Sequence, residues 1–202
     1  LNYDAITDSG YLQNPYRNVL VLNDPNDPSA GANFNTPERY PDTRTSNAVS
    51  ANFLYHLPYR AALKLGYRYF NDDWGIDGHT AEVGYTHPLR DRWILDIGFR
   101  YYQQTHADFY ADLFERPDQQ NFVARDKELS EFQDYTVGLA LTYELLDKGW
   151  GYIDRATLNF SYDHIWFQYD DFSDVRGGVI PPDASEYDFT ADVVQIFGSI
   201  WY

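Results

Sequence analysis

Seven charged side chains lie at alternating positions along the central and later parts of the chain: Lys64, Arg68, Glu82, Asp96, Arg100, Glu144 and Asp163. If neighbouring strands bring them to one face, both signs of charge could form a constriction that selects solutes. They could equally form a ladder of ion pairs that neutralise one another inside a narrow barrel. The two signs interleave instead of segregating. This favours the ladder and leaves the constriction open as the alternative.

Histidine beside acidic residues could support hydrolysis. His79 follows three aspartates, and His164 follows Asp163 directly. An acid and a histidine at the rim of a barrel could act as general acid and base. No nucleophile, base and orienting group occur together at a characteristic spacing, so we expect a protein that is not an enzyme. A hydrolase at the rim is the third and weakest interpretation.

Oxygen-rich clusters raise the question of calcium. They lie at Asp24/Asn26/Asp27, at Asp72/Asp73 and at Asp170/Asp171/Asp174. None has the ligand spacing of an EF-hand loop, which favours solvated acidic loops over a calcium site. The chain has no cysteine, which excludes a disulfide framework, a thiolate metal site and c-type haem attachment. We therefore expect neither a metal nor a cofactor.

The elements that position these residues have a period of two. Apolar and polar residues alternate over most of the chain, as in strands with two different faces. The predicted strands cover residues 1–6, 48–57, 60–70, 80–86, 93–102, 135–144, 155–163 and 187–202. Residues 1–6 resemble the end of a strand that has already begun, so we expect a truncated first strand.

The connections alternate between short and long. Short turns are predicted at 56–60, 87–92 and 146–154. The connections at the other end are predicted at 7–44, 71–78, 103–132 and 170–186, and all of these except 71–78 are long. This alternation is typical of an antiparallel up-and-down sheet with one plain and one elaborated end. No composition shift marks a boundary, so residues 1–202 are predicted to form a single domain. It would contain about eight strands of a larger barrel.

Aromatic residues bracket the apolar face. The pairs Tyr59/Tyr67, Trp93/Tyr101 and Tyr135/Tyr143 share one spacing, and Tyr202 ends the last strand. With a rise of ~3.3 Å per residue and a tilt of ~40°, that spacing covers roughly 20 Å of the membrane normal, close to the apolar band of outer-membrane barrels. Tyrosine and tryptophan rings favour the headgroup level. These residues are therefore predicted to form two aromatic girdles.

The two faces also differ in their small and charged residues. Gly66, Gly84, Gly98 and Gly138 lie on the polar face, where a crowded barrel interior needs space for large neighbours. No Lys, Arg or Glu interrupts the apolar face between the aromatic pairs. Together with the girdles, this favours an all-β, antiparallel, up-and-down transmembrane β-barrel over a soluble lipocalin-like barrel, whose apolar face points inward.

Overall composition limits the partners. Fifteen Lys plus Arg residues stand against 31 Asp plus Glu residues, for a formal net charge of −16. This argues against nucleic acid as a partner. The final residues, Ile200-Trp201-Tyr202, resemble the carboxy-terminal signal that outer-membrane barrels present to the barrel assembly machinery. Membrane lipid and that machinery are the expected partners, and a protein partner could bind the extracellular loops.

Several strings carry a family resemblance. They include Gly10-Tyr-Leu-Gln-Asn-Pro-Tyr-Arg17, Trp74-Gly-Ile-Asp-Gly-His-Thr-Ala-Glu82, Ala124-Arg-Asp-Lys-Glu-Leu-Ser130 and Ser161-Tyr-Asp-His-Ile165. Together they resemble an uncharacterised, domain-of-unknown-function family of Gram-negative outer-membrane β-barrel proteins, and the chain resembles its carboxy-terminal part. The resemblance implies integral insertion in the bacterial outer membrane. It brings no established activity or catalytic residues.

These inferences lead to one expected function and two alternatives. The leading expectation is a porin-like channel or docking protein for a small solute, with short turns in the periplasm and long loops outside. The first alternative is a closed structural or interaction barrel that anchors a partner at the cell surface, and the second is the rim hydrolase. The apolar residues of loop 103–132 predict that it folds, and we expect it to fold over the mouth.

Overall fold

The computed structural model describes residues 1–146 and 149–202, and within them the chain is all-β. Eight antiparallel strands follow the order β1-β4-β5-β6-β7-β8-β9-β10 in one sheet. Every neighbour in that order is also the next long strand along the chain, so the sheet is an up-and-down meander. The strands are β1 (Asn2–Ser9), β4 (Thr43–His56), β5 (Ala62–Asp72), β6 (Asp77–Leu89), β7 (Trp93–Gln104), β8 (Phe132–Leu146), β9 (Arg155–Ser173) and β10 (Glu186–Trp201).

The alternation of residue types locates these strands correctly but ends several of them too early. The loops between long strands are 10–42, 105–131 and 174–185, shorter than the predicted 7–44, 103–132 and 170–186. The sequence pattern misses the loop ends of these strands because they carry polar or aromatic residues on both faces. The backbone pairing between neighbouring strands nevertheless continues there. Phe132, for example, pairs with Tyr169. The predicted turn at 146–154 contains residues 147 and 148, which lie outside the described residues.

The first long loop contains a second sheet that the sequence did not predict. Strands β2 (Asn18–Leu22) and β3 (Ala32–Pro37) form an antiparallel pair. A short 3-10 helix, η1 (Pro28–Ala30), lies in the connection, where the Asp27 side chain accepts a hydrogen bond from Ser29 N. Another, η2 (Lys127–Leu129), lies in loop 105–131.

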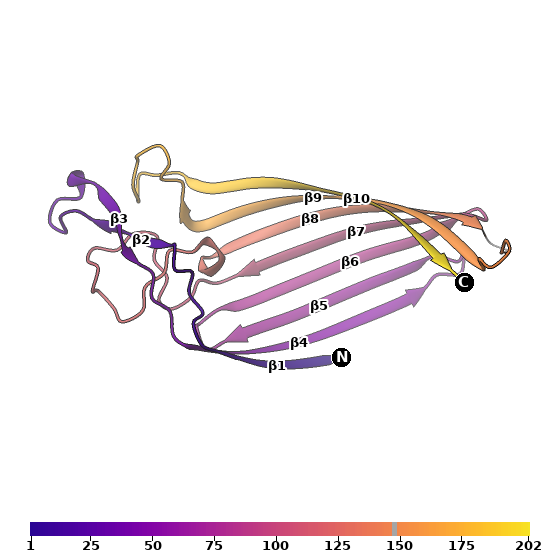
Figure 1. The fold of residues 1–202 in the computed structure, drawn as a ribbon, viewed down its shortest axis with the longest axis horizontal. Coiled ribbons are helices and arrows are strands. Elements are labelled where there is room, and N and C mark those ends of the chain that lie inside the picture. Colours follow the sequence, from indigo (N-terminus) through magenta and orange to yellow (C-terminus); the bar gives the residue numbers. More distant parts are fainter. Residues whose placement is uncertain (147–148) are drawn as a thin grey trace.

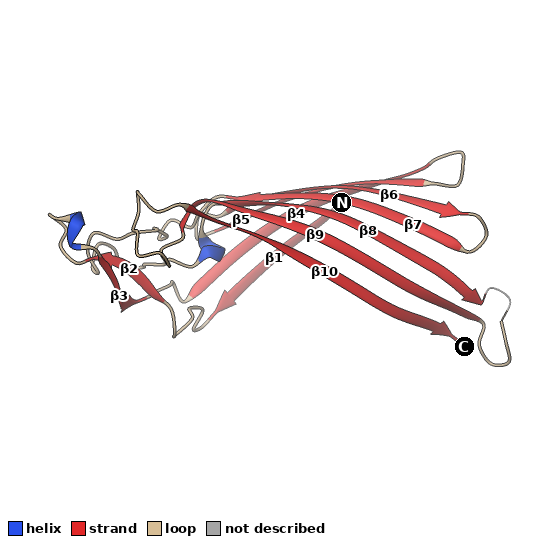
Figure 2. Ribbon diagram, turned by 90° about the horizontal axis from the view of Figure 1, so that it is seen from above, coloured by secondary structure: helices blue, strands red, loops and turns tan. Residues whose placement is uncertain are grey.

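The sheet is open. Strands β1 and β10 form its two edges, and in the described chain they do not pair with each other. Figure 1 shows the loops and the β2–β3 hairpin gathered at one end of the sheet, with the turns and the C-terminus at the other. Figure 2 shows that the sheet formed by the long strands is twisted.

The buried core lies among the loops. One cluster is formed by Tyr40, Trp74, Ile76, Ala107, Phe109, Tyr110, Ala124 and Leu129, and a second by Val19, Val21, Phe114 and Val123. The apolar residues of loop 105–131 therefore drive it to fold against the hairpin and the ends of the strands. They do not leave it extended in solvent.

Large apolar side chains on one face of the sheet are exposed. Leu65, Val83, Phe99, Val137 and Phe160 each keep between 41% and 46% of their surface accessible. Leu65 to Val137 are successive cross-strand partners, so they form a continuous apolar rung on β5 to β8. We call this the apolar face and the opposite side the polar face.

No helix among the described residues is long and apolar enough to cross a membrane.

Candidate solute-binding trough on the polar face

Three glycines form a straight row across the middle of the polar face. Gly84 is the cross-strand partner of Gly98, and Gly98 is the partner of Gly138. The row continues to Lys64 on β5 and to Asp163 on β9. Because glycine has no side chain, the row leaves a bare strip of backbone with a cation at one end and a carboxylate at the other. A shallow hollow of about 280 Å³ lies over this strip; we call it the trough.

The space above the glycine row is empty at its centre and is filled by the Asp163 side chain at one end. A Cβ atom placed on Gly98 would meet no atom within 4 Å. A Cβ atom on Gly138 would lie 2.4 Å from Asp163 Oδ1, so the carboxylate occupies the space that a side chain would fill. The glycines thus have two roles. Gly98 keeps the hollow empty, and Gly138 leaves space for the Asp163 carboxylate directly above its Cα atom.

The charged residues around the trough form separate pairs. Lys64 Nζ lies 3.4 Å from Glu82 Oε2, and Arg100 Nη1 lies 2.7 Å from Asp134 Oδ1. Glu82 and Arg100 are cross-strand partners, yet Arg100 has its close contact with Asp134, a buried residue that the sequence analysis did not select.

Two of the predicted charges remain free of such pairs. Among the described residues, neither Arg68 nor Asp163 has a side-chain ion pair or hydrogen bond. The Arg68 guanidinium lies 5.5 Å from the centre of the Phe70 ring. Arg68 lies on the loop side of the glycine row, because its cross-strand partner on β6 is Thr80. The polar face therefore presents an unpaired cation and an unpaired carboxylate at different depths.

Asp96 and Glu144 complete the predicted set. Asp96 Oδ1 accepts a 2.5 Å hydrogen bond from Thr86 and lines the hollow next to the glycine row. Glu144 lies near the turn end, where its Oε1 accepts a 2.6 Å bond from Arg155 Nε. The structure thus brings Lys64, Glu82, Arg100 and Asp163 around one hollow, with Asp96 beside them. Glu144 lies apart from it.

Aromatic rings cover the polar face between the trough and the loops. The rings of Tyr102 and Phe132 lie 5.6 Å apart, those of Phe132 and Tyr169 5.2 Å, and those of Tyr169 and Tyr187 5.8 Å. The row continues to Phe189, whose ring lies 5.0 Å from Lys127 Nζ. This aromatic row crosses β7 to β10 between the trough and the loop end.

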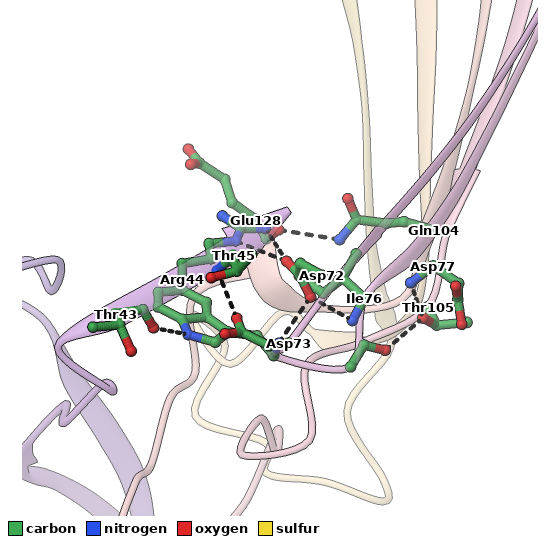
Figure 3. A network of polar contacts seen from close by, with 12 residues as sticks. Thr43, Arg44, Thr45, Asp72, Asp73, Ile76, Asp77, Gln104, Thr105 and Glu128 are labelled. Atoms are coloured by element: carbon green, nitrogen blue, oxygen red, sulfur yellow. Dashed lines mark hydrogen bonds and ion pairs between the residues drawn. The ribbon is translucent and has the colours of Figure 1, made fainter. Parts of the chain in front are cut away.

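A polar network fixes the loop end of β4 to β7 (Figure 3). Asp72 accepts hydrogen bonds from Trp74 N, from Ile76 N and from Arg44 Nε. Gln104 donates to the backbone oxygens of Glu128 and Ser130 and so ties loop 105–131 to β7. These contacts fix the conformation of the chain at the loop end of the polar face.

The loops also contain a buried charge network. Glu38 is 2% exposed, and its carboxylate accepts bonds from Tyr40 Oη at 2.7 Å and from Arg125 N at 2.9 Å. Burial and the neighbouring Glu38 carboxylate raise the pKa of Tyr40, so its hydroxyl remains a donor. Arg125 Nη2 lies 2.6 Å from Asp112 Oδ1. This network fixes the segment directly after β3 against loop 105–131.

The predicted girdle residues pair across the sheet at both ends of the apolar face. Trp93 pairs with Tyr143, with ring centres 4.5 Å apart, and Tyr101 pairs with Tyr135, with ring centres 5.0 Å apart. Their equal sequence spacing therefore becomes two aligned belts on β7 and β8.

The other girdle residues lie on or next to the same face. Tyr67 Oη lies 2.7 Å from His79 Nδ1, and the Tyr59 ring lies 5.9 Å from that of His87. Tyr202 is almost fully exposed. The hydroxyls of the belt nearer the loops find polar partners, as expected of rings with one apolar and one wet end.

The residues of the hydrolase interpretation do not converge. Asp163 lies on the polar face, whereas His164 points to the apolar face, because adjacent strand residues alternate. His164 Nδ1 lies 2.6 Å from Asp192 Oδ1, beside the Trp166 ring. His79 also faces the apolar side, next to Tyr67. Asp163 and His164 therefore cannot act on one substrate atom.

Carboxylates of the acidic clusters accept hydrogen bonds from nearby groups of the protein. Asp24 Oδ1 accepts from Asn26 N, and Asp27 Oδ1 accepts from Ser29 N. Asp73 Oδ1 accepts from Thr45 N, and Asp174 holds Arg176 through both carboxylate oxygens. These carboxylates stabilise turns and strand ends.

Two features of the site lie beyond the sequence reasoning. The glycines were placed on the polar face, but their alignment in one row depends on register, which a single sequence does not specify. Asp134 and the aromatic row were missed because they belong to strand ends where the alternation of apolar and polar residues has faded. A signal was present in the parity of Tyr102, Phe132 and Tyr169, since each continues the polar-face positions of its strand.

Comparison with known proteins gives a family and no activity. A family model described as protein of unknown function (DUF3570) matches residues 1–161. No curated protein and no solved structure matches the chain. The chain belongs to the DUF3570 family of proteins of unknown function.

Proposed function

We propose that the sheet is part of the wall of an outer-membrane β-barrel, with the apolar face in lipid and the trough in the lumen. The single observation that carries this proposal is the exposed apolar rung between two aromatic belts. In water, a contiguous patch of large exposed apolar side chains is a liability. In a bilayer it is the surface that lipid requires, with tyrosine and tryptophan at the headgroup level.

The edges of the sheet support closure in the membrane. Strands β1 and β10 do not pair with each other, and unpaired backbone groups at a sheet edge are costly in lipid. The edges would therefore be satisfied by pairing with each other or with further strands. Closing the sheet around its polar face would place Lys64, Asp163 and the glycine row inside the barrel.

The function we propose is passage or docking of a small solute through this polar lumen. The trough combines a hollow over bare backbone with side chains of both signs, and the aromatic row leads to it from the loop end. The net charge of −16 favours cations over anions near the mouth. No group in the trough forms a catalytic set, so the proposal assigns no reaction.

The folded loops favour a second candidate, a barrel that anchors a partner at the cell surface. Two buried clusters give the loop end its own core. A hollow of about 340 Å³ lies between Trp74, Phe109 and Phe122, with Asp73 and Asp108 beside it. A packed surface with an aromatic hollow is suited to docking. In this candidate the lumen is closed by its own side chains.

Conductance in a planar bilayer separates the two candidates. The complete protein, extracted in detergent, is expected to give stable steps of roughly nanosiemens size if the lumen is open. The matched variants Lys64→Gln and Asp163→Asn remove one charge each from opposite ends of the glycine row. Lys64→Gln should raise cation selectivity and Asp163→Asn should lower it. A silent bilayer would contradict the channel and favour the anchoring barrel.

A further inference from the structure

We propose that His106, Glu131 and Asp171 form a binding site for a divalent transition-metal ion such as Zn²⁺ at the base of loop 105–131. Their ligand atoms all lie within 4.8 Å of one another. His106 opens the loop just after β7, Glu131 closes it just before β8, and Asp171 lies near the end of β9. The site does not depend on the proposed function, because it requires neither a lumen nor a membrane.

The distances fit an ion between the three side chains. His106 Nδ1 lies 3.0 Å from Asp171 Oδ2 and 4.0 Å from Glu131 Oε2. Two atoms that bind a tetrahedral zinc ion at ~2.1 Å are roughly 3.4 Å apart. The two separations lie on either side of that value, so small rotations of exposed side chains suffice. The His106 and Glu131 side chains are about half exposed, which leaves room for water as a further ligand.

Backbone contacts hold the three residues in place. Glu131 N donates to Asp171 Oδ1 at 2.7 Å, which leaves Oδ2 turned toward the histidine. Ala107 N donates to Leu129 O, and Asp170 N donates to Glu131 O. Tyr110 Oη donates to Asp171 O, and its ring lies 6.1 Å from that of His106. The site is therefore built on fixed strand ends.

The charges at this position favour a cation. Two carboxylates, those of Asp171 and Glu131, lie beside the single imidazole of His106. One imidazole with two carboxylates is a donor set that suits zinc and manganese, whereas calcium prefers oxygen ligands alone.

An ion at this site would join three segments. It would link both ends of loop 105–131 to β9 and so fix the loop over the end of the sheet. The amides of Ala107 and Asp170 report on this link, because each forms a backbone hydrogen bond beside the site. Slower hydrogen exchange at both amides is the expected structural effect of the metal.

The test is titration of the full chain in detergent, without a polyhistidine tag, with ZnCl₂. We expect one site per chain, and we expect His106→Ala and Asp171→Asn each to weaken it at least tenfold. The matched control is His56→Ala, an exposed histidine at the opposite end of the sheet, which should keep the wild-type affinity.

A second measurement guards against misfolded variants. Zinc should slow hydrogen exchange at Ala107 and Asp170 in the wild type and in His56→Ala, but not in His106→Ala. CaCl₂ should change neither amide. The proposal is overturned if the wild type binds no zinc, or if a folded His106→Ala chain binds it as tightly as the wild type. In either case the three side chains only contact one another and do not form a metal site.

Discussion

Gly98 on β7 is the direct cross-strand partner of Gly138 on β8, at the centre of the polar face. With Gly84 they leave a bare strip three strands wide between Lys64 and Asp163. Glycine in a strand lowers the stability of the sheet, because it loses more backbone conformational entropy on folding than other residues and has no side chain to pack. A row of three therefore needs a reason, and the open hollow above Gly98 and the close approach of Asp163 to Gly138 supply one.

The two glycines should respond differently to alanine. Gly98→Ala places a methyl group in open space, so its stability should stay equal to the wild type or rise by up to about 1 kcal/mol. Gly138→Ala displaces the Asp163 carboxylate and should be less stable than Gly98→Ala. Urea unfolding in detergent, followed by tryptophan fluorescence, measures the difference. Equal effects of the two substitutions would show that Asp163 does not lean over Gly138.

Arginine should be tolerated on one face of β8 and not on the other. Val137 lies on the apolar face and Thr136, its neighbour, lines the trough. In lipid bilayers Val137→Arg should cost about 2–4 kcal/mol, the range for a cation at the middle of the membrane, and Thr136→Arg should cost less. Reversible unfolding from liposomes measures both. A larger cost for Thr136→Arg would place the polar face in lipid.

Arg125 should stabilise the folded loops. Its guanidinium contacts the Asp112 carboxylate, donates to Ser173 O and lies 4.5 Å from the Phe172 ring. Arg125→Met leaves the Asp112 carboxylate without its cation and should cost roughly 3–5 kcal/mol of local stability. Hydrogen exchange at Val123 N, which bonds to Arg39 O, reports this local opening. Arg116→Met, an exposed arginine in the same loop, is the control and should change little.

Asp174 should titrate at unusually low pH. Bidentate hydrogen bonds from the Arg176 guanidinium, followed by a bond from Arg176 N, lower the pKa of Asp174 to about 2. The carboxylate is favoured in the folded state, so its contribution to stability is complete above about pH 4 and is lost as the pH falls toward 2. Carboxyl NMR titration measures the pKa. Arg176→Ala should return it toward the ordinary value, and an unchanged midpoint would exclude Arg176 as the cause.

The strands and their faces could be predicted from the sequence because a period of two survives wherever one face is apolar. The aromatic residues chosen from their spacing lie opposite one another on β7 and β8, as Trp93–Tyr143 and Tyr101–Tyr135. Strand ends could not be placed, because residues such as Gln103 and Gln133 break the alternation while the backbone ladder continues. Hairpin β2–β3 could not be predicted for a different reason. Its strands are too short to show a clear alternation, and they are stabilised by contacts with loops that are distant in the sequence.

The site was predictable only in part. Charge and glycine positions indicated which residues share the polar face, since parity within a strand determines the face. Which charges meet depends on register and on side-chain reach between strands. Arg100 therefore contacts Asp134 rather than a charge chosen from the sequence, and Arg68 and Asp163 have no ion pair within residues 1–146 and 149–202. The hollow itself required Gly84, Gly98 and Gly138 to align, which a single sequence cannot show.

The most direct test of the account asks which face is wet. The chain has no cysteine, so Gly98→Cys and Phe99→Cys each introduce one thiol, on neighbouring residues that point to opposite faces. The protein is reconstituted in liposomes and treated with a small charged thiol reagent. The account predicts rapid labelling of Gly98→Cys and protection of Phe99→Cys, with both labelled after detergent denaturation. Rapid labelling of Phe99→Cys with protection of Gly98→Cys would contradict it.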